Sequence, residues 1–123
     1  MIYQIADALM SLKPNKQWVM RSSEYSGLEW LDSDTAPTEG EINTELTRLN
    51  NAEPMRLLRI ERDKRLAACD WVCAKATDTG VAVSDAWKTY RQALRDLPAS
   101  ASPSLDSDGY LDMTSVTWPT EPS

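Results

Sequence analysis

The stretch MRLLRIERDKRLAACDWVC, residues 55–73, decides the fold class of this 123-residue chain. It contains no glycine or proline and is rich in leucine, arginine, alanine, methionine and lysine, which are good helix formers. Its apolar residues recur at three- and four-residue spacing, as they do on the buried face of a helix. The stripe consists of Leu58, Leu66, Cys69 and Cys73, widened by Leu57, Ile60 and Trp71. We therefore predict one helix over 55–73, with Trp71 near its end.

A second helix follows after a turn that closes at Gly80. Ser84 is a candidate N-cap, because its hydroxyl can accept a hydrogen bond from the first helical turn. The apolar residues after it recur at helical spacing until Pro98 ends the pattern. They are Trp87, Tyr90, Leu94 and Leu97. The two segments predict a helical hairpin within residues 54–98, whose aromatic side chains meet near the turn.

The first 53 residues predict a mixture of helix and strand. Residues 2–12 have the spacing of an amphipathic helix. Residues 18–20 and 28–31 are short apolar runs on either side of a polar stretch with a glycine, which favours a small β-hairpin. Thr38, with Glu41 three residues later, is typical of a capping box at a helix start. We expect the helix that starts near Thr38 to break or kink at 50–54, where Pro54 lies.

From residue 99 the composition changes. Residues 99–109 contain serine, aspartate and proline with one large apolar residue, which predicts a flexible tether. Val116 and Trp118 then alternate with threonines, as in an extended segment that lies on a surface, either that of its own domain or that of a partner. The chain thus divides into 1–53, 54–98 and 99–123. The predicted fold class is α+β and mainly α, with a small β-hairpin and three to four helices that end in a helical hairpin and an extended tail.

The composition excludes several classes of function. The chain has no histidine, which removes Ser-His-Asp and Cys-His catalysis. Its net charge of −6 disfavours nonspecific nucleic-acid binding. No stretch is apolar enough to predict a signal peptide or a membrane span. The sequence also shows no Gly-rich phosphate loop, so we expect neither an enzyme nor a cofactor.

The charge is unevenly distributed. Residues 1–53 carry nine acidic and four basic side chains, and 97–123 carry four acidic and none that is basic. Residues 56–96 carry nine basic and six acidic ones. Such a basic middle segment either forms a solvated helix face or docks on an acidic partner surface.

The sequence predicts no metal site. Two cysteines, Cys69 and Cys73, are too few ligands for zinc without histidine, and we expect both to be small buried residues. The segment DSDGYLD at 106–112 lacks the full pattern of a calcium loop and its final glutamate.

Two sequence words in the hairpin resemble a known family. They are RIERDKRLAACDW at 59–71 and WKTYRQALRDLP at 87–98. Together they resemble the tail fibre assembly, or tail assembly chaperone, proteins of tailed bacteriophages, which often finish with a Trp-Pro pair such as Trp118-Pro119. The N-terminal half, with GLEWLD at 27–32 and PTEGEI at 37–42, is similar to other small phage tail-region proteins.

The resemblance implies a non-catalytic protein that binds a tail fibre or another distal tail protein and assists its folding, trimerisation or attachment. It implies a place in the host cytoplasm during assembly, and some family members remain in the virion tail. The alternative function is a permanent virion component, such as a fibre cap or connector of the tail or baseplate. The sequence leaves the chain's own oligomeric state open.

Aromatic and arginine side chains of the hairpin and tail are the candidate partner-binding residues, because both types are enriched in interfaces. They are Arg59, Arg62, Trp71, Trp87, Tyr90, Arg91, Arg95 and Trp118. The alternatives are a structural core for the aromatic residues and pairing within the chain for the arginines. In that case we expect Asp70 to pair with Arg91 or Arg95, and Asp96 to pair with Arg62.

Overall fold

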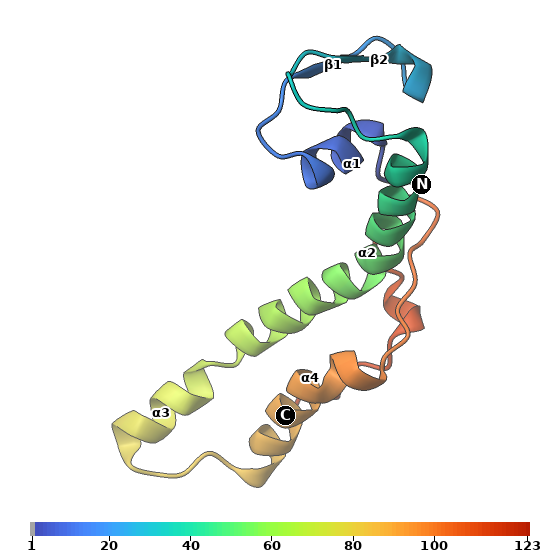
Figure 1. The fold of residues 1–123 in the computed structure, drawn as a ribbon. Coiled ribbons are helices and arrows are strands. Elements are labelled where there is room, and N and C mark those ends of the chain that lie inside the picture. The colour runs from blue at the N-terminus through green and yellow to red at the C-terminus, as the bar shows by residue number, and fades with distance from the viewer. Residues whose placement is uncertain (1) are drawn as a thin grey trace. The chain divides into compact units, whose positions relative to one another are not determined.

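The computed structural model describes residues 2–123, and it confirms a mainly helical α+β fold (Figure 1). The helices are α1 (Ile5–Leu12), α2 (Glu39–Ala68), α3 (Trp71–Thr79) and α4 (Asp85–Ser100). Strands β1 (Trp18–Met20) and β2 (Leu28–Trp30) form one antiparallel hairpin. The chain divides into two compact units, Met1–Glu53 and Pro54–Ser123. None of the helices in the described residues combines the length and the apolar character that crossing a bilayer requires.

The N-terminal unit has a core that α1 and α2 share. Ala8 and Leu9 of α1 pack with Ile42 and Leu46 of α2, and all four are buried. The two strands pair Trp18 with Trp30 and Met20 with Leu28, and these four side chains pack against that core. The predicted first helix and β-hairpin are therefore confirmed. A lone two-stranded hairpin is marginal in water, so this packing stabilises it.

Asp34 fixes the loop after β2. Its backbone carbonyl accepts a hydrogen bond from the indole N–H of Trp30 at 2.8 Å, and its carboxylate accepts one from Lys13 at 3.2 Å. Burial alone would raise the pKa of Asp34, but the hydrogen bonds and the charges of Lys13 and Lys16 outweigh it and lower that pKa overall. The loop is thus held by a carboxylate that is favoured in its charged form.

Helix α2 begins as the sequence predicts but does not end where predicted. The hydroxyl of Thr38 accepts a hydrogen bond from the backbone N–H of Glu41 at 3.1 Å, which confirms the cap. The predicted break at 50–54 is absent, since α2 continues through Pro54 to Ala68. A proline inside a helix removes one backbone hydrogen bond, and the good helix formers after it continue the helix here. The division between the two units falls directly before Pro54.

The predicted helix over 55–73 is interrupted at Cys69 and Asp70. Their backbone N–H groups donate to carbonyls three residues back, at 3.2 and 3.3 Å, instead of four. The carbonyl of Leu66, which a continuing helix would offer to Asp70, accepts a hydrogen bond from the guanidinium of Arg91 at 3.1 Å. A side chain from α4 therefore binds this carbonyl, which also accepts the N–H of Cys69, at the point where α2 stops, and α3 starts at Trp71. We call residues 68–71 the α2–α3 joint.

The prediction ends the helix at residue 73, whereas α3 continues it to Thr79, and the predicted start of α4 is confirmed. Helix α3 ends at Gly80, which has the left-handed φ of 72° that glycine adopts without strain. The hydroxyl of Ser84 accepts a hydrogen bond from the backbone N–H of Trp87, as expected of an N-cap. Helix α4 continues past Pro98 to Ser100, one turn further than predicted, because only the bond to the Leu94 carbonyl is lost there.

The C-terminal unit contains two buried clusters. One joins Cys69, Tyr90 and Leu94 close to the α2–α3 joint. The other joins Leu58 of α2, Leu97 of α4 and Val116 of the C-terminal segment. Residues 110–119, for which the sequence leaves two docking surfaces open, thus pack on the helices of their own unit. The first two residues of the predicted tether belong to α4.

Candidate partner-binding site

Three of the candidate aromatic residues form a row between α3 and α4. The rings of Trp71 and Trp87 meet edge to face, with centroids 5.6 Å apart and planes at 76°. Trp87 meets Tyr90 in the same way, at 5.9 Å and 77°. Tyr90 is buried and Trp87 is half-buried, whereas Trp71 is 52% exposed. The row therefore runs from the core to the surface, and its outer end is available to a partner.

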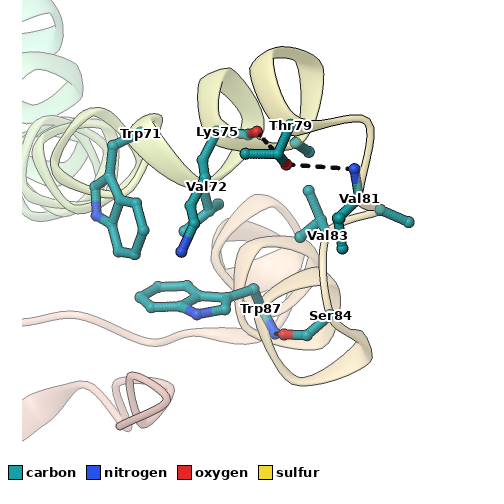
Figure 2. A pocket seen from close by; sticks show the side chains of 10 residues that line it. Trp71, Val72, Lys75, Thr79, Val81, Val83, Ser84 and Trp87 are labelled. Atoms are coloured by element: carbon teal, nitrogen blue, oxygen red, sulfur yellow. Dashed lines mark hydrogen bonds between the residues drawn. The ribbon is translucent and has the colours of Figure 1, made fainter.

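A pocket of about 200 Å³ opens beside the outer end of this row (Figure 2). Its walls come from α3, from the loop after Gly80 and from the first turn of α4. The lining residues are Trp71, Val72, Lys75, Ala76, Thr79, Val81, Ala82, Val83, Ser84 and Trp87. In Figure 2 the amino group of Lys75 lies close to the rings of Trp71 and Trp87. Val81 is 69% exposed, so the rim as well as the wall is apolar. We call this cavity the tip pocket.

Most hydrogen-bonding groups of the tip pocket are already used. The hydroxyl of Thr79 donates to the carbonyl of Lys75 at 2.8 Å and accepts from the backbone N–H of Val81 at 3.3 Å. The hydroxyl of Ser84 caps α4. Within residues 2–123 the ammonium of Lys75 and the indole N–H groups of Trp71 and Trp87 have no hydrogen-bond partner. The side chains that line the pocket therefore leave only donors unused, which suits a partner that brings acceptors.

Arg91 holds the α2–α3 joint, next to Trp71 of the pocket. Its side chain is 15% exposed and donates to the Leu66 carbonyl, to Cys69 Sγ at 3.0 Å and to Asp70 Oδ1 at 3.0 Å. The last contact confirms the expected pair with Asp70. Burial alone would lower the pKa of Arg91, but its contacts with Cys69 and Asp70 outweigh burial and raise it. Arg91 thus remains charged and acts within the chain.

The remaining arginines are spread along the hairpin. Arg62 pairs with Asp63 at 2.6 Å and donates to the backbone carbonyl of Arg95 at 3.4 Å. The predicted pair of Arg62 with Asp96 is wrong, because that carboxylate accepts from Gln92 instead, at 2.9 Å. Arg95 also binds Gln92, at 2.8 Å. Arg59 is exposed on α2. These side chains do not line the tip pocket.

Trp118 lies in the other cluster of the C-terminal unit. It packs beside Leu58, Leu97 and Val116, and the guanidinium of Arg65 lies 4.2 Å from the centroid of its ring. This cation–π contact fixes the C-terminal segment on α2. The indole N–H of Trp118 is buried and has no partner among the described residues. Trp118 is therefore positioned as a structural residue of the unit.

The two thiols differ in their surroundings. Cys69 is buried, as predicted, whereas Cys73 is exposed, contrary to the prediction. No group of three or more potential metal ligands occurs within the described residues.

The segment at 106–112 uses its carboxylates within the chain. The carboxylates of Asp106 and Asp112 accept hydrogen bonds from backbone N–H groups of their own turns.

Sequence reasoning identified the two tryptophans of the tip pocket but missed its other wall. Val81 and Val83 lie in the loop between two helices, where helical spacing gives no signal. The only indication is an apolar Val-Ala-Val run placed between a helix-ending glycine and a capping serine. Such a loop keeps apolar side chains at the surface, where they can meet a partner.

The tip pocket and both clusters of the C-terminal unit lie in a part of the chain that matches a known family. The family model for phage tail assembly chaperone protein matches residues 55–123. No curated protein and no solved structure matches the chain. The match leaves out the first 54 residues, so the similarity of the N-terminal half to other small tail-region proteins stays a prediction. Since the match covers more than half of its residues, the chain belongs to the phage tail assembly chaperone family.

Proposed function

We propose that this chaperone binds a tail fibre or another distal tail protein, here called the client, and assists its folding, trimerisation or attachment. Membership of the tail assembly chaperone family supports the role in assembly. The observation that carries the binding step is the tip pocket with its exposed rim. Binding is non-covalent and takes place in the host cytoplasm while tails are assembled.

The chemistry of the tip pocket supports this proposal. Trp71 and Val81 are 52% and 69% exposed, although both are apolar. Aromatic residues in such positions are the ones that contribute most to protein–protein binding. Arg91 also holds the α2–α3 joint, next to Trp71 of the pocket, through three hydrogen bonds. A preformed pocket loses little conformational entropy when it binds.

The proposed mechanism is a temporary cover for the client. An unassembled fibre subunit exposes apolar surface and unpaired strand edges that favour aggregation. The tip pocket accepts one apolar side chain of that surface until subunits associate. The net charge of −6 keeps the chaperone soluble during this period.

Co-expression with a tail fibre protein of the same phage tests the proposal. We expect a complex that co-elutes on a sizing column with light scattering, or a fibre that becomes soluble and trimeric. Val81→Glu places a charge on the pocket rim and should abolish the effect. Thr77→Glu is the matched control, because Thr77 is exposed on α3, four residues before Val81, and does not line the pocket. A fibre that behaves identically with and without the chaperone would refute a role in fibre assembly.

Mass spectrometry of purified particles separates the two ways in which the chain could act. A chaperone that departs after assembly is absent from the particles. A chain present at a fixed ratio to the fibre would instead be a permanent virion component, such as a fibre cap or connector.

A further inference from the structure

A second exposed aromatic residue stands on the C-terminal segment. Tyr110 is 72% exposed, the largest exposure among the large apolar side chains described. It lies at the end of a tight turn in which Asp106 donates its backbone N–H to the Tyr110 carbonyl at 2.7 Å. Asp106 Oδ1 also accepts the N–H of Tyr110 at 3.0 Å. Gly109 takes the positive φ of 87° that this turn requires. The ring of Tyr110 is thus held outward on an ordered turn.

Negative charge surrounds this ring. The turn carries Asp106 and Asp108, and Asp112 follows two residues after Tyr110. No basic residue occurs anywhere in 97–123. The carboxylate of Asp108 has no partner within residues 2–123, and Asp106 and Asp112 each keep one carboxylate oxygen unused. We call residues 106–112 the acidic turn.

The tip pocket and the acidic turn are complementary. The pocket is apolar, and the unused polar groups of its side chains are the ammonium of Lys75 and two indole N–H donors. The acidic turn offers an aromatic ring with acceptors and negative charge around it. A cavity of about 150 Å³ is large enough to bind benzene, so one of about 200 Å³ can receive a phenol ring. Size, polarity and charge therefore match.

The two features cannot meet within one chain. Leu111, next to Tyr110, packs in the cluster of Leu58 and Leu97. Trp87 of the pocket lies ten residues before Leu97 on α4, which is about 15 Å along the helix axis. Figure 1 shows the segment with the acidic turn beyond the end of α4 that is far from the α3–α4 loop. The packing of Leu111 thus holds Tyr110 away from its own pocket.

We propose that Tyr110 of one copy enters the tip pocket of a second copy, so that the chaperone associates with itself. The ring lies against Trp71 and Trp87 of the second copy, and the carboxylates of the acidic turn face its Lys75. The contact joins two different surfaces, and each copy carries both of them, the tip pocket and the acidic turn. The contact is weakened by salt, since opposite charges meet in it. It does not depend on the proposed client, although a client in the same pocket would compete with it.

Sedimentation velocity of the full-length protein over a range of concentrations tests this contact. We expect the average mass to rise with concentration and to fall when salt is added. Tyr110→Ser and Val81→Glu should each raise the dissociation constant at least about thirtyfold, because the first removes the aromatic anchor and the second places a negative charge where the acidic turn binds. Met113→Ser is the matched control, because Met113 is exposed outside the acidic turn. Circular dichroism checks that each variant keeps its helices.

A mixing experiment makes the test specific. Tyr110→Ser keeps an intact pocket, and Val81→Glu keeps an intact acidic turn. Neither variant associates alone, but an equimolar mixture should form a one-to-one heterodimer. A wild-type chain that remains monomeric, variants that associate as the wild type does, or a mixture that stays monomeric would each overturn the proposal. If Val81→Glu loses client binding and Tyr110→Ser keeps it, the result supports the proposed function and says nothing of self-association.

Discussion

Replacing Arg91 by alanine tests how the α2–α3 joint is held. The guanidinium makes three contacts, to the backbone carbonyl of Leu66, to the sulfur of Cys69 and to the carboxylate of Asp70. The carbonyl contact joins the guanidinium to the last turn of α2, at an acceptor that the backbone N–H of Cys69 also uses. The contact with Asp70 is an ion pair whose acidic partner is 66% exposed. The two contributions differ in kind, so they can be separated by substitution.

The expected magnitudes follow from burial. A hydrogen bond from a charged donor to a shielded acceptor contributes about 1.5–3 kcal/mol. An exposed ion pair contributes roughly 0–1 kcal/mol. Arg91→Ala should therefore lower the free energy of unfolding of the C-terminal unit by about 2–4 kcal/mol. Asp70→Asn, which leaves the carbonyl contact in place, should lower it by less than about 1 kcal/mol.

Urea titration followed by the indole N–H signals in NMR spectra measures these differences. Trp71, Trp87 and Trp118 all belong to the C-terminal unit and report its unfolding separately from the N-terminal unit. Arg91→Lys is the matched control for charge, because a single ammonium cannot reach three partners in a fork. If Asp70→Asn destabilises the unit as strongly as Arg91→Ala, the ion pair holds the joint and the reasoning from the carbonyl contact is refuted.

Three further predictions follow from the described contacts. Leu94→Ala should destabilise the C-terminal unit by about 2–5 kcal/mol, since Leu94 is fully buried, and a loss below about 1 kcal/mol in urea unfolding would contradict this. Gly80→Ala should cost about 1 kcal/mol through its positive φ alone, because no atom lies within 4 Å of the added methyl group; a thermal melt that equals the wild type would refute it. The lowered pKa of Asp34 contributes stability that is complete above its usual value of 3.8 and is lost as the pH falls below it. The acid unfolding curve of Asp34→Asn should therefore be flatter, and an unchanged curve would count against this role.

Local signals in the sequence were sufficient for most element starts. Thr38 and Ser84 cap helices as their side chains predict, because an N-cap depends on residues within one turn. The β-hairpin was also predictable from two short apolar runs. Signals of this kind involve residues that are close in the sequence, so they can be recognised without knowledge of the tertiary structure.

The structure differs from the prediction where residues far apart in the sequence contact one another. The interruption at Cys69 depends on Arg91, which is 22 residues further along the chain, and nothing in the helical pattern of 55–73 indicates it. The tip pocket was only half predictable for the same reason, since α3 and α4 must pack before Val81 and Trp87 share a wall. Continuation of α2 through Pro54 likewise reflects the surrounding helix more than the proline itself.

The contrast between the two thiols makes the α2–α3 joint measurable by chemistry. Cys73 is exposed and should react with an alkylating reagent as fast as a free peptide thiol does. Cys69 is buried beneath the guanidinium of Arg91 and can react only while the joint is open. The ratio of the two alkylation rates gives the fraction of time for which the joint is open, with Cys73 as an internal reference in the same molecule. A client that seats in the tip pocket would stiffen this region, and it would then slow the alkylation of Cys69 without a change at Cys73.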